Sequence, residues 1–362
     1  MTVLQIKALY KKYSRKDAFA LQKFSMEVEK GELMALIGES GSGKTTLLRL
    51  IAGFEEPQSG EIYINGKQVV GNKTFIAPEK RNVGMVFQDY ALFPHLTIEE
   101  NVKYGLNNWN KKDRQERVDE MLRLVGLMAF KERYPHQLSG GQQQRVAMAR
   151  ALAPKPSLIL MDEPFSNLDS VLKEQVREDI RRIMKSTGTT AIFVTHDTKD
   201  ALSTADRISI LKDGKIQQIG PPQELFDAPE NIYVANFFGK INVLNALTSP
   251  GGYKTPIGFL PCSANVKQGE KVTLVIRPEN IHVCKENSSH LYGKVKNVLY
   301  LGDQKQVTLS IENNSQPYKL LLKIENDAKL EKGEMVHFEV LQDKIQVLDT
   351  CWYPESTPLT SH

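Results

Sequence analysis

The sequence predicts two domains of different class, an α/β domain on a parallel sheet over residues 1–238 and a smaller all-β domain over residues 239–353. Three observations support this prediction. Short apolar runs alternate with helix-like stretches in the first part, strands separated by turn residues follow in the second, and a glycine-rich loop joins a predicted strand to a predicted helix. Residues 354–362 are expected to form a loose tail.

The composition excludes several classes of protein. The chain has 362 residues, of which 41% are hydrophobic and 25% charged, as in an ordinary soluble protein and unlike a disordered or collagen-like one. A net charge of +4 does not by itself indicate a nucleic-acid partner. No apolar run of 18 residues or more and no signal-peptide pattern occur, so no membrane span or leader is predicted. Three scattered cysteines indicate a reducing compartment: Cys262, Cys284 and Cys351.

The α/β prediction follows from elements taken in chain order. Lone apolar runs predict buried strands over 33–37, 83–87, 158–161 and 191–194. Helical spacing predicts a helix over 45–52, which stops at Gly53, and another that carries Val118, Met121, Leu122 and Val125. Strands without polar alternation are typical of a parallel sheet covered on both faces. Asn65-Gly66 and Asp213-Gly214 are typical of hairpin turns, so some antiparallel strands are expected as well.

From about residue 240 the pattern changes to strands alone. They are predicted over 272–276, 295–300, 307–311, 318–324 and 335–341. No helix of comparable length is predicted there, so this part is expected to form a small barrel or sandwich. His282 and Cys284 alternate with apolar neighbours as strand residues do, and with His290 they are interpreted as parts of a barrel wall rather than as a metal sensor.

Residues 38–45 carry the first chemical motif. Their sequence GESGSGKT matches the phosphate-binding pattern GxxxxGK[ST] between a predicted strand and a predicted helix. The glycines let backbone N–H groups surround phosphate oxygens, and the helix start adds its positive dipole end. Lys44 supplies a charge to the outer phosphates, and the Thr45 hydroxyl can ligate Mg²⁺. The predicted nucleotide-binding residues here are Gly38, Glu39, Ser40, Gly41, Ser42, Gly43, Lys44, Thr45 and Thr46.

Two further motifs follow. The sequence LSGGQ at 138–142 precedes a helix predicted over 143–152, and the exposed N–H groups of Ser139 and Gly140 at its start form a second anion site. Asp162 ends a buried strand, where its carboxylate can help to hold Mg²⁺. Glu163 lies next to it and is expected to polarise the attacking water as general base.

Taken together, these motifs resemble the ATP-binding cassette family, the ATPase subunits of ABC transporters, over residues 1–235. The resemblance implies a P-loop NTPase fold with a helical subdomain, and ATP and Mg²⁺ as ligands. It also implies a homodimer in which the loop of one chain and the signature residues of the other enclose each ATP. The signature residues are Ser139, Gly140, Gly141 and Gln142.

The same resemblance assigns roles to four more residues. His196, after the run 192–195, resembles the switch histidine that contacts the γ-phosphate. Gln88 resembles the Q-loop glutamine, which reaches Mg²⁺ and the water and reports to the membrane subunit. Asp169 belongs to a D-loop at 166–169, where Asn167 replaces the usual alanine. Tyr13 is expected to stack on adenine, with Tyr10 as the competing candidate.

Residues 78–98 look like the importers whose ATPase carries a C-terminal β domain. Arg277-Pro278-Glu279 and the stretch 300–303 resemble the OB-like (TOBE) regulatory domain of that group. The stretch 75–94 is most similar to ferric iron importers, ahead of polyamine importers and of those for sulfate, molybdate or sugars. The resemblance implies two transmembrane permease subunits, an indirect extracytoplasmic solute-binding protein, no nucleic acid, and a peripheral location on the cytoplasmic face of the inner membrane.

Two other classes compete with the importer motor. Soluble cassette ATPases of DNA repair or translation carry two cassettes or a long coiled-coil insertion, whereas this sequence has one phosphate loop and no heptad run. A non-enzymatic nucleotide sensor would be favoured by the loss of Glu163 or His196, and both residues are present.

Overall fold

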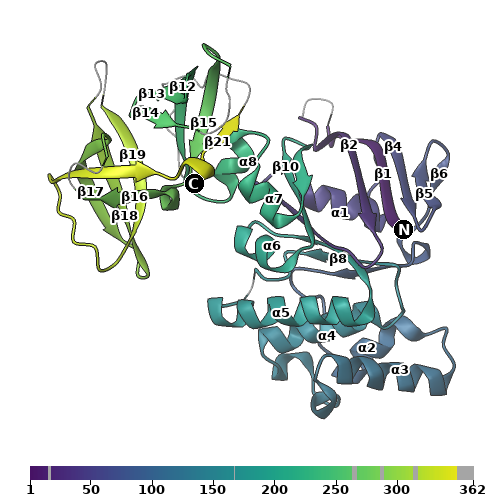
Figure 1. Cartoon of the computed structure of the whole chain (residues 1–362). Coiled ribbons are helices and arrows are strands. Elements are labelled where there is room, and N and C mark those ends of the chain that lie inside the picture. Colours follow the sequence, from purple (N-terminus) through teal and green to yellow (C-terminus); the bar gives the residue numbers. More distant parts are fainter. Residues whose placement is uncertain (15–17, 167, 263–266, 286–288, 313–316, 349–362) are drawn as a thin grey trace. The chain divides into compact units, whose positions relative to one another are not determined.

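The computed structural model describes residues 1–14, 18–166, 168–262, 267–285, 289–312 and 317–348. The chain divides into two compact units, Met1–Leu225 and Phe226–His362, and each is described by itself (Figure 1). The domain boundary predicted at residue 238 stays a prediction, and the predicted tail at 354–362 lies outside the described residues. Across the described ranges, no helix combines the length and the apolarity needed to cross a membrane.

The first unit contains two sheets. The antiparallel one has the order β2-β1-β4-β5-β6. Its strands are β1 (Thr2–Lys11), β2 (Leu21–Glu29), β4 (Ser59–Ile64), β5 (Lys67–Gly71) and β6 (Thr74–Phe75). The other has the order β11-β10-β3-β9-β8-β7 and is parallel except for the β10–β11 pair. Its strands are β3 (Leu33–Gly38), β7 (Val83–Val86), β8 (Leu158–Asp162), β9 (Thr190–Val194), β10 (Arg207–Lys212) and β11 (Lys215–Gly220). The predicted α/β class is therefore confirmed.

Helix α1 (Lys44–Ala52) lies between the two sheets (Figure 1). Its leucines and isoleucine are fully buried in one core with residues of both sheets, and each such side chain contributes about 1.5–3 kcal/mol. Gly53, with φ 90°, ends the helix as predicted. Arg81 also holds this end, because its guanidinium donates to the carbonyls of Leu50 at 2.7 Å and Ile51 at 3.0 Å. No local sequence pattern predicts this buried arginine.

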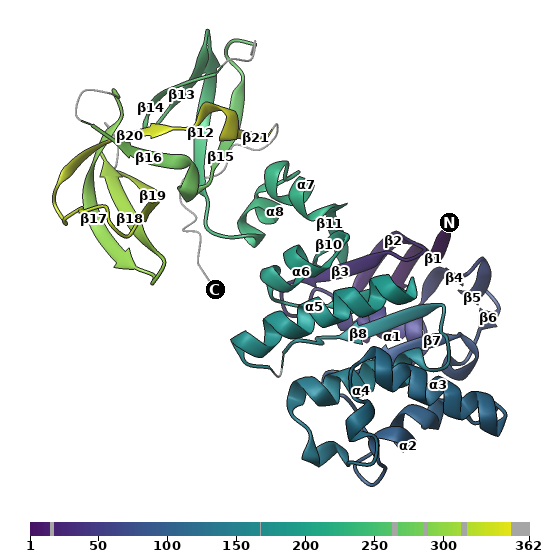
Figure 2. The same cartoon turned by 60° about the horizontal axis from the view of Figure 1, so that its bottom comes forward.

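Five more helices lie between α1 and α7 in the described part of the first unit. α2 (Ile98–Lys103), α3 (Lys111–Leu124) and α4 (Gly140–Leu152) pack on one another and lie together in Figures 1 and 2. α5 (Ser170–Thr187) packs against α6 (Thr198–Thr204), and α6 packs against β3. The helix predicted over 143–152 begins instead at Gly140, because Ser139 and Gln142 cap it reciprocally. Short 3-10 helices are Pro78–Lys80, Tyr104–Leu106, Met128–Phe130, Pro135–Gln137, Pro278–Asn280 and Gln342–Lys344.

Both predicted hairpin turns are present. Asn65 and Gly66 have φ 49° and 75°, and Asp213 and Gly214 have φ 49° and 72°. Left-handed backbone at both central residues is typical of the type I′ turn, whose twist matches the flanking strands. These turns join β4 to β5 and β10 to β11.

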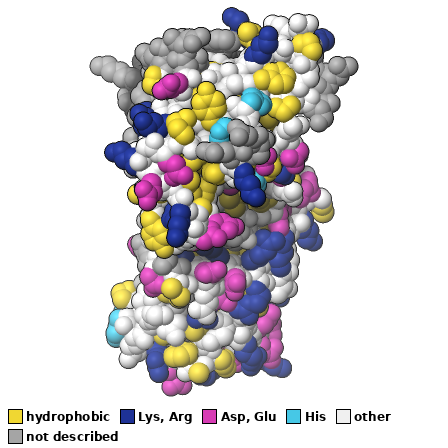
Figure 3. All heavy atoms as spheres, turned by 60° about the vertical axis from the view of Figure 1, so that its left-hand side comes forward, with side chains coloured by type: hydrophobic (Ala, Val, Ile, Leu, Met, Phe, Trp, Pro, Cys, Tyr) yellow, Lys and Arg dark blue, Asp and Glu magenta, His cyan; other side chains and the backbone are white. Residues whose placement is uncertain are grey.

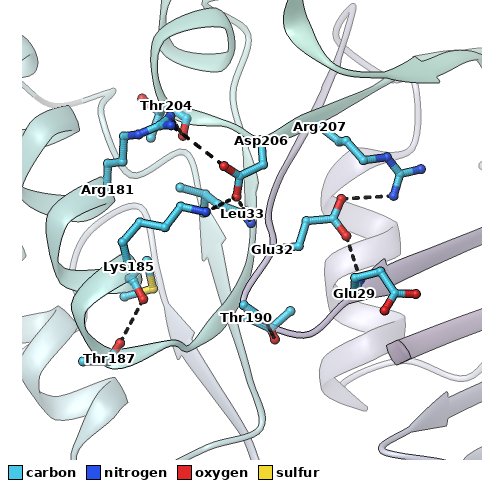
Figure 4. A network of polar contacts seen from close by, with 12 residues as sticks. Glu29, Glu32, Leu33, Arg181, Lys185, Thr187, Thr190, Thr204, Asp206 and Arg207 are labelled. Carbon is cyan, nitrogen blue, oxygen red and sulfur yellow. Dashed lines mark hydrogen bonds and ion pairs between the residues drawn. The ribbon is translucent and has the colours of Figure 1, made fainter. Parts of the chain in front are cut away.

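A polar network ties the elements at the amino ends of the parallel strands (Figure 4). The Asp206 carboxylate accepts from the Leu33 N–H at 2.9 Å and from the Lys185 ammonium at 2.6 Å. Glu32, only 8% exposed, pairs with Arg207 at 3.0 Å. The network therefore connects β3, α5 and β10 at the end of the sheet opposite the phosphate loop.

The second unit begins with short helices and continues as strands. α7 (Pro222–Asp227) crosses the division between the units, and α8 (Ile232–Phe237) follows. One antiparallel sheet contains β12 (Asn242–Ser249), β13 (Gly252–Thr255), β14 (Gly258–Pro261), β15 (Lys271–Ile276) and β21 (Gln346–Leu348). The other contains β16 (Ile281–Cys284), β17 (Tyr292–Tyr300), β18 (Gln304–Ile311), β19 (Tyr318–Glu325) and β20 (Met335–Val340). Side chains from both sheets share one core, so the all-β prediction is confirmed.

The motif Arg277-Pro278-Glu279 anchors one end of this unit. The Arg277 side chain is 3% exposed, donates to the Phe226 carbonyl at 2.9 Å and lies 3.6 Å from the centre of the Phe226 ring. Burial lowers the pKa of this guanidinium. Gln346 donates to the same carbonyl at 3.0 Å. The arginine therefore joins α7 to the strand-rich part within the second unit.

Two of the three candidate metal-sensor residues lie on a strand. His282 and Cys284 lie on β16, opposite Glu339 and His337 of β20, whereas His290 contacts the Phe259 carbonyl at 2.8 Å. Within the described ranges, no three His, Cys, Asp or Glu side chains converge as a metal site would require.

On the face shown in Figure 3, Lys and Arg side chains are interspersed with Asp and Glu and with hydrophobic groups.

Candidate functional site

The carboxyl ends of the parallel strands bring most of the predicted site residues to one edge of the sheet. β3 ends at Gly38, β8 ends at Asp162 and β9 ends at Val194, two residues before His196. β3, β9, β8 and β7 are neighbours in that order, so the segments that follow them are adjacent. This edge is where open α/β sheets bind their ligands.

The phosphate loop needs glycine for both conformation and space. Gly41 and Gly43 have φ 81° and 103°, a region that other residues rarely adopt. A Cβ at Gly43 would lie 2.2 Å from the Ala20 carbonyl oxygen, and one at Gly38 would lie 2.3 Å from that of Leu211. Backbone from two other segments therefore presses against the loop and fixes its shape.

Lys44 lies folded against the loop that it follows. Its side chain, 7% exposed, donates to the carbonyls of Gly38 and Glu39, both at 2.8 Å, and to the Ser42 hydroxyl at 3.2 Å. Burial lowers the pKa of this ammonium, and the nearby Glu163, Asp162 and Glu39 carboxylates act in the opposite direction. The loop thus contains a desolvated positive charge that suits phosphate oxygens.

Thr45 and Asp162 supply oxygen donors beside the loop. The Thr45 hydroxyl lies 3.4 Å from the Asp162 carboxylate. Burial is the main cause that raises the pKa of Asp162, with a further contribution from the adjacent Glu163 carboxylate. Mg²⁺ prefers hard oxygen ligands and one or two carboxylates, so this donor set fits that ion. A bound cation would also relieve the crowding of the two carboxylates.

Glu163 and His196 meet although they come from different strands. The Glu163 carboxylate lies 3.3 Å from Nδ1 of His196, whose side chain is 64% exposed. Glu163 has φ 45°, and its backbone is held in place by the Val194 carbonyl at 3.1 Å and the Ser166 hydroxyl at 3.0 Å. Left-handed backbone outside glycine concentrates at functional sites. This conformation turns the chain sharply directly after β8.

Gln88 lies two residues beyond β7, whose last residue Val86 pairs with Met161 of β8. Its exposed side chain therefore follows the strand next to the one that ends at Asp162. The next residues are held by Arg150 of α4, which donates to the carbonyls of Tyr90 at 2.9 Å and Ala91 at 2.6 Å. The role of Arg150 is not predicted from the sequence, because nothing in the local spacing marks a contact across 60 residues.

Tyr13 lies against the helix that follows the phosphate loop. Its hydroxyl is 3.0 Å from the Thr46 hydroxyl and 3.0 Å from the Glu55 carboxylate, and the side chain is half-exposed. The ring of Tyr10 instead meets that of Phe19 edge-on at 6.0 Å. Tyr13 therefore lies beside α1, and its stacking on adenine stays a prediction.

The signature residues form a second group at the start of α4. The Ser139 hydroxyl accepts from the Gln142 N–H at 3.4 Å, and the Gln142 side chain accepts from the Ser139 N–H at 3.0 Å. Asp169 caps α5 in a similar way, since it accepts from the Leu172 N–H at 2.9 Å. A Cβ at Gly141 would lie 2.9 Å from the Leu172 side chain, so α4 and α5 approach closely here. Asn167 lies outside the described residues.

Comparison with known proteins covers both units. Residues 21–166 match the family model described as ABC transporter, and residues 274–348 match the model described as TOBE domain. The Fe(3+) ions import ATP-binding protein FbpC of Fusobacterium nucleatum is 39% identical, over 95% of this chain and 92% of that protein. The spermidine/putrescine import ATP-binding protein PotA 1 of Pseudomonas aeruginosa is 40% identical, over 95% and 96%. The sulfate/thiosulfate import ATP-binding protein CysA of Caulobacter vibrioides is 44% identical, over 76% and 81%.

Solved structures match the first part of the chain. The ATP-binding cassette MJ0796, solved as a dimer in a post-hydrolysis state bound to ADP and Pi, is 34% identical with a TM-score of 0.53. The match covers 60% of this chain and 98% of that one. CbiO1 from Clostridium perfringens, part of an ABC transporter complex, is 30% identical with a TM-score of 0.58, over 62% and 90%.

Proposed function

Because the chain belongs to the ATP-binding cassette family, as an importer-type ATPase with a C-terminal TOBE domain, we propose that two copies drive the uptake of ferric iron. ATP binding and hydrolysis and the importer class follow from the family. One observation carries the proposed mechanism. A phosphate loop with its lysine, two carboxylates and a histidine meet at one edge of the sheet, while a second anion site lies at the start of α4 in the same chain.

The site residues divide the work of hydrolysis. Lys44 and the loop N–H groups hold the β- and γ-phosphates, and Tyr13 stacks on the adenine. Thr45, Asp162 and Gln88 would hold Mg²⁺, which supplies positive charge to the phosphate oxygens. Glu163 accepts a proton from the attacking water, whose oxygen forms a bond to the γ-phosphorus while the bond to the bridging oxygen breaks. His196, 3.3 Å from Glu163, orients the γ-phosphate.

Each ATP is proposed to lie between two chains. Ser139, Gly140, Gly141 and Gln142 of one chain would close on the γ-phosphate bound by the other, with Asp169 at the same interface. A mixture of Lys44→Ala and Ser139→Arg chains tests this arrangement. In the mixed dimer one composite site keeps both halves intact, and the other loses both. Nucleotide-dependent crosslinking should report one occupied site per mixed dimer. Crosslinking that needs both motifs in the same chain contradicts the arrangement.

The partners are proposed from the importer class. Two transmembrane permease subunits would bind the surface around Gln88, and a solute-binding protein would act on the permease without touching this chain. The chain would then lie peripherally on the cytoplasmic face of the membrane. Residues after 238 are proposed to regulate and not to hydrolyse, since their cores contain strands and no phosphate loop among the described residues.

Ferric iron is proposed as the solute, with polyamine as the alternative. Relatives named for ferric iron and for spermidine/putrescine match nearly the whole chain at 39% and 40% identity, so identity alone does not choose between them. The stretch 75–94 resembles ferric iron importers more than polyamine importers, and this resemblance is the reason for proposing iron first. These residues flank Gln88, so they reflect which permease is driven rather than what it carries.

Uptake in cells that lack the gene tests the solute. Labelled Fe³⁺, spermidine and sulfate are offered separately, with the parent and the Glu163→Gln variant supplied in turn. We expect Fe³⁺ uptake to be lost and to return only with the parent. Loss of spermidine uptake alone would reverse the order, and loss of sulfate uptake alone would favour the third relative's solute. Neither result would alter the assignment as an importer ATPase.

A further inference from the structure

The hydroxyl of Tyr90 is buried without a hydrogen-bond partner among the residues that the structure describes. Tyr90 is 8% exposed and lies two residues after Gln88. A tyrosine hydroxyl is protonated at neutral pH, so this group is available as a hydrogen-bond donor. Buried polar groups in folded proteins are almost always paired, and an unpaired one requires an explanation.

The hydroxyl points to the start of the signature helix. A Cβ at Gly140 would lie 3.7 Å from the Tyr90 hydroxyl oxygen and 3.3 Å from the Leu168 side chain. Three segments of the proposed ATP site therefore meet at this point: the Gln88 loop, the start of α4 and the segment before α5.

A second contact with the same helix fixes the backbone of this loop. Arg150 donates to the backbone carbonyls of Tyr90 and Ala91, which have left-handed φ of 63° and 46°. This conformation is unfavourable for both residues, so the arginine holds the loop in a defined shape. The phenol ring thus has little freedom to seek a partner unless the start of α4 moves relative to the loop.

We propose that Tyr90 is a positioning residue whose hydroxyl gains an acceptor from residues 138–140 when two chains close on ATP, which couples Gln88 to Ser139 within one chain. This inference rests on the proposed function. A group that is unpaired in one state and paired in another favours the second state by the difference in its interactions. Closure is the step that would engage the residues flanking this contact along the chain. These are Gln88, two residues before Tyr90, at its own chain's ATP, and Ser139, directly before Gly140, at the partner's ATP.

The test uses Tyr90→Phe, which keeps the ring and removes only the hydroxyl. It is made in the parent and in Glu163→Gln, with the exposed Tyr134→Phe as matched control. Without nucleotide, the variant should melt about 2–4 °C higher, because an unpaired buried group has been removed. With ATP, closed-dimer formation in the Glu163→Gln background should weaken about tenfold, or about 1.4 kcal/mol. In the parent background, kcat should fall while KM for ATP stays unchanged.

The opposite signs of these two effects identify a positioning role. A purely structural role would move the melting temperature and closure in the same direction, and that result would overturn the inference. An unchanged melting temperature, or closure equal to that of Tyr134→Phe, would also overturn it. If Glu163→Gln alone forms no ATP-dependent dimer, the failure lies in the proposed function, and the inference falls with it.

Discussion

The two anion-binding regions of the first unit are built on different principles. The phosphate loop contains a buried lysine and glycines in left-handed conformations. Beside it lies the Asp162 carboxylate, whose pKa is raised by burial and by the adjacent Glu163. The start of α4 has no cation among Ser139 to Gln142. Its backbone is extended at Ser139 and helical from Gly140, and the Ser139 hydroxyl is already used to cap its own helix. The loop is a complete phosphate site, whereas the helix start offers only N–H groups and a dipole.

This difference supports the proposal that the phosphate loop binds the nucleotide and that the start of α4 closes on it. A helix start at the surface contributes about 0.3–1 kcal/mol to a nearby negative charge, far less than a desolvated lysine with a set of oriented N–H groups. The loop can therefore bind nucleotide by itself. The helix start becomes effective only when a second chain presents a phosphate that is already bound.

The largest expected effect comes from Glu163 on the loop side. Glu163→Gln keeps the shape and the hydrogen bonds of the side chain but cannot accept a proton, so kcat should fall about 10²–10⁴-fold. ATP binding and dimer closure should persist, because neither region has lost an anion-binding group. Steady-state phosphate release and ATP-dependent gel filtration measure the two properties. Hydrolysis at the parental rate would remove Glu163 from the role of base.

The next effect separates the two regions directly. Lys44→Ala removes a charge-assisted contact worth about 1.5–3 kcal/mol, so ATP affinity of the single chain should fall on the order of 10- to 100-fold. Ser139→Ala should leave that affinity unchanged, because in the proposed arrangement the start of α4 contacts the nucleotide of the other chain. Fluorescent ATP-analogue titration at concentrations below dimerisation measures both. Equal losses of ATP affinity in the two variants would contradict the proposed difference between the phosphate loop and the start of α4.

Glycine substitutions sharpen the contrast in backbone. Gly43→Ala introduces left-handed strain of about 1–3 kcal/mol and places a Cβ 2.2 Å from the Ala20 carbonyl oxygen. Gly140→Ala meets the Leu168 side chain at 3.3 Å and the Tyr90 hydroxyl at 3.7 Å and gains helix propensity, so its effect should be under about 1 kcal/mol. Urea denaturation of both variants gives the comparison. The expectation is wrong if Gly140→Ala proves the more destabilising change.

The smallest effect concerns Asp162 and pH. Its folded-state pKa is raised above the ordinary 3.8, so the ionised carboxylate destabilises the nucleotide-free fold. Stability should therefore fall as pH rises from 3.8 through that raised pKa, and this contribution should vanish in Asp162→Asn. At neutral pH the variant should melt roughly 1–3 °C higher while it loses hydrolysis. Thermal melts of both chains across this pH range decide the point, and parallel pH profiles would contradict it.

Local patterns were sufficient to predict most of the fold. Apolar runs identified four parallel strands, and the two Asx-Gly turns identified the hairpins, because each signal depends on neighbours in sequence. The sequence predicts the start of α4 three residues late. The capping box of Ser139 and Gln142 starts the helix at Gly140, despite the two glycines between them.

Contacts between distant segments were not predictable in the same way. The spacing of the motifs indicated that Lys44 and Glu163 serve one site. It did not reveal the hydrogen bonds from Arg150 to the Tyr90 carbonyl and from Arg81 to the end of α1. It also did not reveal the left-handed backbone of Glu163. Each depends on a partner brought near by the fold, and a charged residue on a helix has the same local pattern whether it is solvated or buried. The roles of the site residues themselves stay predictions.

The three hydrogen bonds of Lys44 have a kinetic consequence for the nucleotide cycle. Because the ammonium already holds the Gly38 and Glu39 carbonyls and the Ser42 hydroxyl, the loop is ordered before any phosphate arrives. Binding then exchanges one set of lysine partners for another and leaves little chain entropy to be lost. Release reverses that exchange, because the loop's own carbonyl and hydroxyl oxygens compete with the phosphates for the lysine. An ATPase must release ADP in every catalytic cycle. Release is easier when the oxygens of the binding loop can replace the phosphate as partners of Lys44.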